Sequence, residues 1–139
     1  MIVPDWLKEL PNKKLCRYTE NSEKLSASFS HHHIKPDNPI YKRLQSLVGA
    51  DIIHARYNEY ALDDHISEHI DSAFPNAHTF IIELTQDKRL WREGGSLLFM
   101  QSSELPYVIM MPPNTKHKVL KGDTVRRTVV FWANVEVPA

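Results

Sequence analysis

The chain has 139 residues, a length that fits one domain with a buried core. Its 17 lysines and arginines equal its 17 aspartates and glutamates, so the charge balance gives no support for a strong polyanion-binding surface. The single cysteine, Cys16, rules out an internal disulfide, and no apolar run approaches the ~18 residues of a membrane span. We therefore expect a cytoplasmic protein that is a monomer and has no membrane partner.

Residues 1–37 predict an N-terminal extension. Pro4–Leu10 favours a short helix that ends at Pro11, and Lys14–Ser30 alternates around a polar turn, as a β-hairpin does. The three histidines of His31–His33 cannot all point the same way, so we interpret them as a polar loop rather than a metal site.

Residues 38–139 predict one helix followed by a β-rich core. Asn38 suits the N-cap, Pro39 the first helical position and Gly49 the residue after the helix. The apolar residues of this helix share one face, so we expect it to pack on a sheet. Strand patterns occur at 51–60, 79–84, 96–100, 107–111, 117–120 and 126–130, with a turn at 91–95, and the last two strands are predicted to form a hairpin.

These elements favour a mainly β fold with a helical buttress. Short strands separated by turns at regular spacing are typical of a jelly roll, the cupin-like double-stranded β-helix. We expect the whole chain, 1–139, to form a single domain. The open mouth of such a barrel is a common place for a metal.

The stretch 58–71 concentrates groups that bind metals. His69 and Asp71 form an H-x-D pair, and their side chains share one face of an extended strand because strand side chains alternate. We choose His117 as the third ligand, because it begins a later strand just after a tight turn. Two imidazoles and one carboxylate on one face of an octahedron leave three open positions, which suits non-haem Fe(II) oxygenases.

Iron of this type binds an oxoacid co-substrate at its open positions. If the oxoacid is 2-oxoglutarate, the carboxylate at its other end, away from the metal, needs a cation from the protein. Arginine offers a planar, permanently charged fork for such a group. Arg126 and Arg127 both lie on the strand after His117, and alternation lets only one of them face the barrel interior. We prefer Arg126, because Thr128, two positions further on, is a small polar residue that suits a cofactor pocket.

These residues resemble the Fe(II)/2-oxoglutarate-dependent dioxygenase superfamily. Three further patterns are similar to its AlkB-type branch, namely Asn58-x-Tyr60, the D-x-I-x-x-H-x-D text at 64–71 and the G-S-L-L-x-M text at 95–100. The resemblance implies that the hairpin at 14–30 acts as a lid and that Fe(II) is held by His69, Asp71 and His117. It implies 2-oxoglutarate bound by Asn58, Tyr60 and Arg126, with O2 as the oxidant, and it implies oxidative demethylation of N-alkylated nucleobases in nucleic acid.

Other substrates are left open by the same residues. The order of Trp91, the Gly94-Gly95 pair, His117 and Arg126 also looks like the prolyl-hydroxylase branch, which implies a peptide substrate. The AlkB-type pattern R-x5-R is met only at its first position, because Trp132 stands at the second. A peptide, an amino acid or a small metabolite is therefore an alternative to nucleic acid.

Two other functional classes compete with an oxygenase. The text at 65–69 reads H-x-x-E-H, as in inverted zinc peptidases, but that chemistry needs a helix and a larger catalytic domain. The segment has a strand pattern instead. The second rival is a cupin-like binding module without catalysis, in which the histidines only pack or face solvent.

Overall fold

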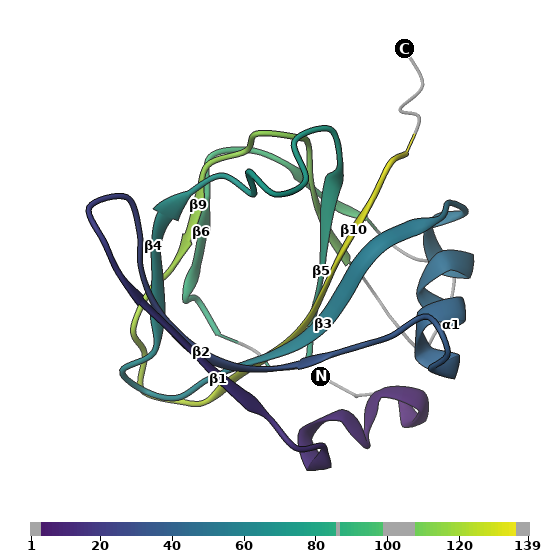
Figure 1. The fold of residues 1–139 in the computed structure, drawn as a ribbon, viewed down its shortest axis with the longest axis horizontal. Helices are drawn as coiled ribbons and strands as arrows, with labels where there is room; N and C mark the ends of the chain where they lie inside the picture. Colours follow the sequence, from purple (N-terminus) through teal and green to yellow (C-terminus); the bar gives the residue numbers. More distant parts are fainter. Residues whose placement is uncertain (1–3, 86, 99–107, 136–139) are drawn as a thin grey trace.

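One curled antiparallel sheet dominates the computed structural model, which describes residues 4–85, 87–98 and 108–135 (Figure 1). Its strands follow the order β6-β9-β4-β2-β3-β10-β5-β8-β7, and β1 pairs with β2 beside this path. The strands are β1 (Cys16–Asn21), β2 (Ser26–His33), β3 (Ile52–Tyr60), β4 (His65–His69), β5 (His78–Glu83), β6 (Leu90–Arg92), β7 (Ser96–Leu98), β8 (Val108–Met111), β9 (His117–Val119) and β10 (Arg126–Ala133).

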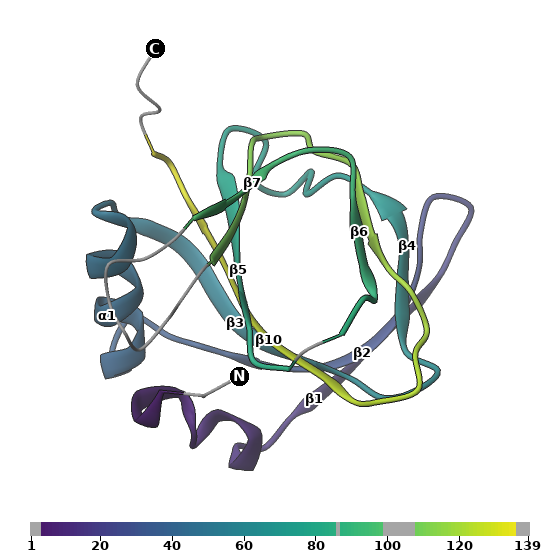
Figure 2. The same ribbon diagram turned by 180° about the vertical axis from the view of Figure 1, so that it is seen from behind.

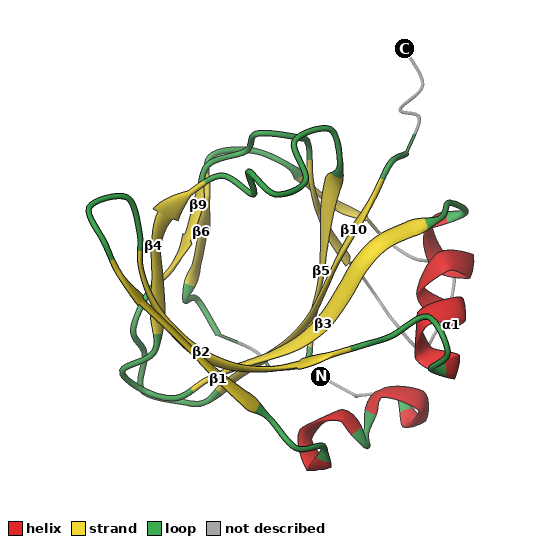
Figure 3. Cartoon of the chain, viewed as in Figure 1, coloured by secondary structure: helices red, strands yellow, loops and turns green. Residues whose placement is uncertain are grey.

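The sheet curls until two walls face each other, with β4, β9 and β6 on one side and β3, β10 and β5 on the other (Figures 1 and 2). The helical elements lie outside this ring (Figure 3). They are α1 (Pro39–Val48) and two 3-10 turns at Asp5–Leu7 and Leu10–Asn12. The predicted mainly β jelly roll with a helical buttress is therefore confirmed.

Helix α1 has the boundaries that its sequence predicts. The side chain of Asn38 accepts a hydrogen bond from the backbone N–H of Ile40 at 2.9 Å, and Gly49 ends the helix with a φ of 64°. The Tyr41 hydroxyl donates to the carbonyl of Ile52 at the start of β3. This bond and the buried Leu44 fix the helix against the outside of the sheet.

Alternation along the strands divides their side chains between two environments. Outward-facing residues of β3, β5 and β10, such as Tyr57, Phe80 and Phe131, pack with α1 and the N-terminal turns in the largest core cluster. Inward-facing residues form two smaller clusters inside the curl, which include Ile81 and Trp132 in one and Tyr60 in the other. The inner side is where a cavity forms.

Two predictions about the strands are wrong. His31–His33 is not a loop, because β2 continues to His33 and residues 30–33 pair with residues 56–59 of β3. The strands at 117–120 and 126–130 do not form a hairpin, because β9 pairs with β4 and β6 while β10 lies between β3 and β5. The chain crosses from one wall to the other between β9 and β10, as jelly rolls do.

Smaller differences concern the ends of elements. The predicted helix at Pro4–Leu10 is instead the pair of 3-10 turns, the second of which includes Pro11. Trp91 belongs to β6 rather than to a turn. Residues 99–100 and 107 of two predicted strands lie outside the described residues. None of the described helices is long and apolar enough to cross a membrane.

Arg89 joins two loops at one end of the barrel. Arg89 is 4% exposed. Its guanidinium donates to the carbonyls of Tyr60, Ala61 and Asp64, at and after the end of β3, at 3.3, 2.8 and 2.7 Å. It also donates to the carbonyls of Leu120 and Thr124 after β9, at 2.8 and 2.7 Å. Gly122 leaves room for this side chain, because a Cβ there would lie 2.5 Å from the Arg89 Cδ.

Candidate metal centre

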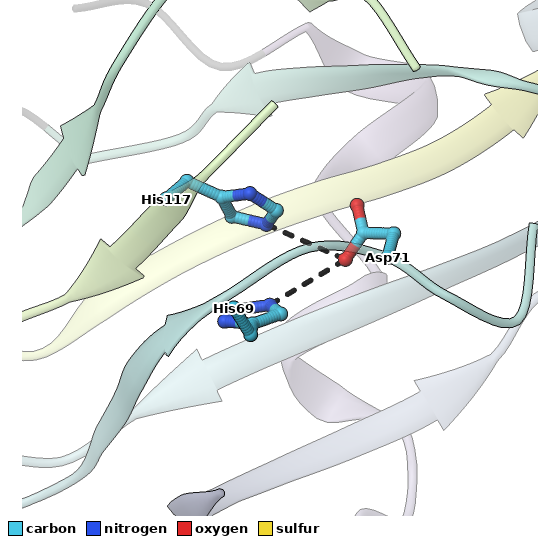
Figure 4. A group of neighbouring side chains, drawn as sticks. All are labelled: His69, Asp71 and His117. Carbon is cyan, nitrogen blue, oxygen red and sulfur yellow. Dashed lines mark ion pairs between the residues drawn. The ribbon is translucent and has the colours of Figure 1, made fainter. Parts of the chain in front are cut away.

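His69, Asp71 and His117 converge on one point inside the barrel (Figure 4). His69 ends β4, His117 begins β9, and the two are directly paired across the antiparallel strands. Asp71 lies two residues beyond the end of β4. The Nε2 atoms of His69 and His117 are each 3.4 Å from the Asp71 Oδ1, and the three ligand atoms all lie within 4.8 Å of one another.

Backbone carbonyls orient both imidazoles. The Nδ1 of His69 lies 2.8 Å from the carbonyl oxygen of Ser67, and the Nδ1 of His117 lies 2.9 Å from that of Thr115. A carbonyl only accepts hydrogen bonds, so each Nδ1 carries the proton. The Nε2 lone pairs then point toward Asp71, which is the arrangement that metal-binding histidines require.

The carboxylate of Asp71 is held by its other oxygen. The Asp71 Oδ2 accepts hydrogen bonds from the Thr79 hydroxyl at 2.7 Å and from the Trp132 indole N–H at 3.1 Å. Thr79 lies on β5 and Trp132 on β10, so the wall opposite β4 fixes the orientation of this carboxylate. The Oδ1 is left to face the two imidazoles.

The electrostatics of the three side chains attract positive charge. Burial by itself raises the pKa of Asp71, but the two imidazoles and Thr79 outweigh it and hold that pKa well below its ordinary value. For His117, burial by itself lowers the pKa. The neighbouring Asp71 carboxylate outweighs burial, so the pKa of His117 lies above its ordinary value. A divalent cation bound between the three groups would supply the charge that Asp71 attracts.

The spacing of the Asp71 oxygen from the two imidazole nitrogens suits a transition metal. Atoms about 2.1 Å from one ion are about 3.0 Å apart at right angles and about 3.4 Å apart at a tetrahedral angle. The 3.4 Å separations of Asp71 Oδ1 from both imidazoles fall within this range. Three ligands from one side of the ion leave further positions open, so the residues present fit a catalytic metal rather than a closed structural one.

The other residues expected at the site line the same cavity. Asn58 and Tyr60 from β3 and Arg126 from β10 lie along it together with the three clustered side chains. Arg126 faces inward with Thr128, Val130 and Trp132, whereas Arg127 lies on the other face and pairs with Glu59 at 3.6 Å. The inward residue is thus the one preferred from the sequence.

Arg126 is neutralised on one side by two carboxylates. Its Nη1 and Nη2 donate to the two oxygens of Glu83 at 2.7 and 2.9 Å, and Nη1 also donates to Asp87 at 3.0 Å. The Nε of Arg126 is buried and has no hydrogen-bond partner. The guanidinium therefore keeps one edge available for a further acceptor.

Several buried donors in this cavity lack partners. They are the Nε atoms of Arg56 and Arg126 and the Thr128 hydroxyl. Buried polar groups are nearly always hydrogen-bonded, so a group of unpaired donors around one cavity indicates a place for a polar ligand. The open space is about 40 Å³, enough for a few water molecules, so a larger ligand needs a lining side chain to move.

The H-x-x-E-H text at 65–69 does not form a zinc-peptidase site. Its residues lie on β4 rather than on a helix. The His65 Nε2 is 2.8 Å from the Ser26 hydroxyl, and only His69 of this text belongs to the cluster of ligand atoms.

Reasoning from the sequence missed Arg56, Thr79 and Glu83. For Arg56 a signal was present, because strand alternation puts residue 56 on the same inward face as Asn58 and Tyr60. Thr79 and Glu83 gave no comparable signal. Their roles depend on β5 lying next to β10, which no local pattern predicts.

No protein-family model matches the sequence, and no curated protein matches it. Among solved structures, the chain is similar to a 2OG-Fe(II) oxygenase family oxidoreductase from Burkholderia pseudomallei, with a TM-score of 0.61, 16% identity, and coverage of 93% of this chain and 77% of that one. A Pseudomonas putida prolyl-4-hydroxylase gives a TM-score of 0.60 with 13% identity, covering 94% of this chain and 83% of the other.

A cupin 2 conserved barrel domain protein from Rhodopseudomonas palustris is also similar, with a TM-score of 0.53, 10% identity, and coverage of 91% of this chain and 74% of that one. At such low identities these likenesses establish the fold alone. The fold is the jelly roll that oxygenases and cupins share, and a fold of this kind hosts several functions.

Proposed function

We propose that this protein is an Fe(II)/2-oxoglutarate-dependent dioxygenase. The observation that carries the proposal is the convergence of the His69 Nε2, the His117 Nε2 and the Asp71 Oδ1 on one point beside a cavity with unpaired donors. Two imidazoles and one carboxylate are the ligand set that suits non-haem Fe(II) oxygenases. The fold likeness to two such enzymes supports this choice over other metal chemistry.

The chain's own residues have distinct roles in this proposal. His69, Asp71 and His117 hold the metal, and Thr79 and Trp132 keep the Asp71 carboxylate in position. The open Nε edge of Arg126, the Thr128 hydroxyl, Asn58 and Tyr60 receive the far carboxylate of 2-oxoglutarate. When bound, Fe(II) with 2-oxoglutarate and O2 supplies an oxidation that yields succinate and CO2 and places one oxygen atom in a substrate C–H bond.

Two substrate classes follow from different observations. The N-x-Y and D-x-I-x-x-H-x-D patterns support N-alkylated nucleobases, whose hydroxylated methyl group is released as formaldehyde. The fold likeness to a prolyl-4-hydroxylase supports a peptide. In either case the hairpin of β1 and β2 acts as the lid. The centre of its Phe29 ring lies 5.4 Å from that of Tyr60, which lines the cavity.

Metal binding is the first test. Anaerobic titration with Fe(II) should give one site per wild-type chain, and His69→Ala or Asp71→Ala should weaken binding at least a hundredfold, because each removes a ligand. His65→Ala is the matched control, since His65 lies on the same strand outside the ligand cluster, and it should bind normally. Unchanged binding by both ligand variants would refute the metal centre.

Turnover then separates the substrate classes. Wild-type protein with Fe(II), 2-oxoglutarate and air is assayed for succinate and formaldehyde against methylated oligonucleotides, proline-containing peptides and free amino acids. A nucleic-acid substrate should show a rate that falls steeply with salt, whereas a neutral peptide should not. Protein that purifies without iron and forms no succinate with the whole panel would instead support the cupin-like binding module.

A further inference from the structure

Arg56 is a second guanidinium in the cavity and has no assigned role. It lies on β3, on the same inward face as Asn58 and Tyr60. Its guanidinium carbon is 4.9 Å from the centre of the Trp132 ring and 5.8 Å from that of Phe29. The Arg56 guanidinium therefore lies against two aromatic rings. An aromatic ring attracts a cation much more weakly than an anion does.

The charge of Arg56 lacks a partner among the described residues. The structure gives the guanidinium groups of Arg126 two carboxylates and of Arg89 five carbonyls, but it gives the guanidinium of Arg56 no hydrogen bond or ion pair with any residue that it describes. Its Nε is buried. Both oxygens of Asp71, the acidic group at the metal centre, already face other groups. Arg56 is partly buried, and its buried Nε donor lacks a partner, so this guanidinium is suited to an anion from outside the chain.

Arg56 lies at the metal end of the cavity. On β3 it is paired with Val130, whereas Tyr60, four residues further on, is paired with Arg126. Four residues of strand span about 13 Å, so the backbone positions of the two arginines are well separated along the barrel. Arg56 also contacts Trp132, whose indole N–H holds Asp71. Arg56 is thus the arginine beside the metal centre, and the backbone of Arg126 lies further along the barrel.

We propose that Arg56 binds a carboxylate group beside the metal centre, as a second anion site distinct from that at Arg126. The proposal rests on the proposed function. The carboxylate has one of two sources. It is either the carboxylate next to the keto group of the oxoacid, or a carboxylate carried by the substrate, which would make the enzyme specific for anionic substrates.

The narrow cavity is compatible with this role. A ligand larger than a few water molecules needs a lining side chain to move, and Arg56 is the charged lining residue least restrained by hydrogen bonds. Arg126 is held by three hydrogen bonds to carboxylates. A long, flexible arginine stem can swing aside and still keep its guanidinium within reach of the ligand.

Equilibrium binding tests the proposal without turnover. Chains loaded with Mn(II), which does not support the oxidation, are titrated by calorimetry with 2-oxoglutarate and with pyruvate, which has only the carboxylate next to the keto group. The variants are Arg56→Met, Arg56→Lys and Arg126→Met. Arg127→Met is the matched control, because Arg127 is adjacent on β10 but faces away from the cavity. Thermal unfolding checks that each variant folds.

If the oxoacid is the source, Arg56→Met weakens binding of both 2-oxoglutarate and pyruvate at least tenfold, Arg56→Lys recovers part of the loss, and Arg126→Met weakens only 2-oxoglutarate. If the substrate is the source, Arg56→Met leaves both oxoacids unchanged. It then raises the KM of carboxylate-bearing members of the substrate panel at least tenfold and leaves that of their amides unchanged, with succinate as the readout.

A folded Arg56→Met variant that matches wild type in oxoacid binding and in all KM values would overturn the role of Arg56 and leave the proposed function standing. Wild-type protein that binds neither Mn(II) nor 2-oxoglutarate would overturn the proposed function itself, and the Arg56 site with it. The Arg127→Met control also removes one positive charge, so an effect that it shares with Arg56→Met would come from the loss of charge in general.

Discussion

Trp132 contacts both Asp71 and Arg56 in the cavity. It occupies the second position of the R-x5-R pattern that the sequence resembles, and in the structure its indole N–H donates to Asp71. A guanidinium is nonetheless present beside it, because Arg56 from β3 lies over the indole ring.

We predict that Trp132→Phe weakens metal binding about tenfold. Phenylalanine retains much of the apolar ring but cannot donate to Asp71, and loss of such an outer partner typically weakens metal affinity 10- to 100-fold. The measurement is a Mn(II) titration. Trp91→Phe is the control, because Trp91 is 40% exposed and lies on β6 outside the cavity lining. Equal affinities for the two variants would show that the indole N–H does not position Asp71.

The residues of the candidate site differ in how far the sequence predicts them. His69, Asp71 and His117 can be selected because their chemistry is specific and their spacing fits one strand end and one strand start. The partners of Arg126 cannot be selected in this way. Glu83 and Asp87 approach it only because β5 pairs with β10 and the chain after β5 turns back toward it. Pairing of distant strands has no local signature in the sequence.

An ion pair links β1, which the sheet holds only through β2 among the described strands, to the loop between β3 and β4. Arg17 on β1 donates from both terminal nitrogens to the carboxylate of Asp64, in the loop between β3 and β4, at 2.8 and 2.5 Å. Asp64 also accepts from the backbone N–H of Ala61. The hydrogen bonds from Arg17 outweigh the opposing effect of burial, so the pKa of Asp64 lies below its ordinary value.

We predict that Asp64→Asn lowers the free energy of unfolding at pH 7 by about 1 kcal/mol, a small value because Arg17 is largely exposed. A carboxyl whose pKa is lower in the folded chain stabilises the fold above the pKa of the unfolded chain, about 3.9, and this contribution is lost as the pH falls through the folded pKa. The difference between wild type and variant should therefore be constant from pH 7 to about pH 4 and shrink below that.

Urea unfolding at intervals from pH 7 to pH 3 measures this difference. Asp63→Asn is the control, because Asp63 is the exposed neighbour of Asp64, and it should change stability little at any of these pH values. A difference between wild type and Asp64→Asn that stays constant down to pH 3 would show that the carboxylate of Asp64 is not the source of the stabilisation.

Elements with local determinants were predicted well, and those with distant determinants were not. Helix α1 begins and ends where Asn38 and Gly49 indicate, because a cap acts on the adjacent turn. The strand character of His31–His33 depends on pairing with β3, some 25 residues later in the chain, so the histidines themselves gave no indication of it. The false hairpin of β9 and β10 arose because adjacent strands usually pair and a jelly roll separates these two.

For the whole molecule, we predict that Arg89→Met lowers the free energy of unfolding by about 3 kcal/mol or more. Methionine fills a similar volume but leaves the carbonyls of two loops without their donor, and each lost bond to a charged group is worth about 1.5–3 kcal/mol before the loops adjust. Urea unfolding checks the value. Lys88→Met, an exposed neighbour, is the control, and a loss below 1 kcal/mol for Arg89→Met would contradict the prediction.

The Arg89 contacts also hold two loops together at one end of the barrel in a chain whose single cysteine cannot form an internal disulfide. Arg89 lies between the loop after β3 and the loop after β9 and acts as a non-covalent cross-link between segments far apart in the sequence. A guanidinium does not lose its charge at physiological pH and is indifferent to oxidants and reductants. This fastening should therefore persist under reducing conditions that would open a disulfide in the same position.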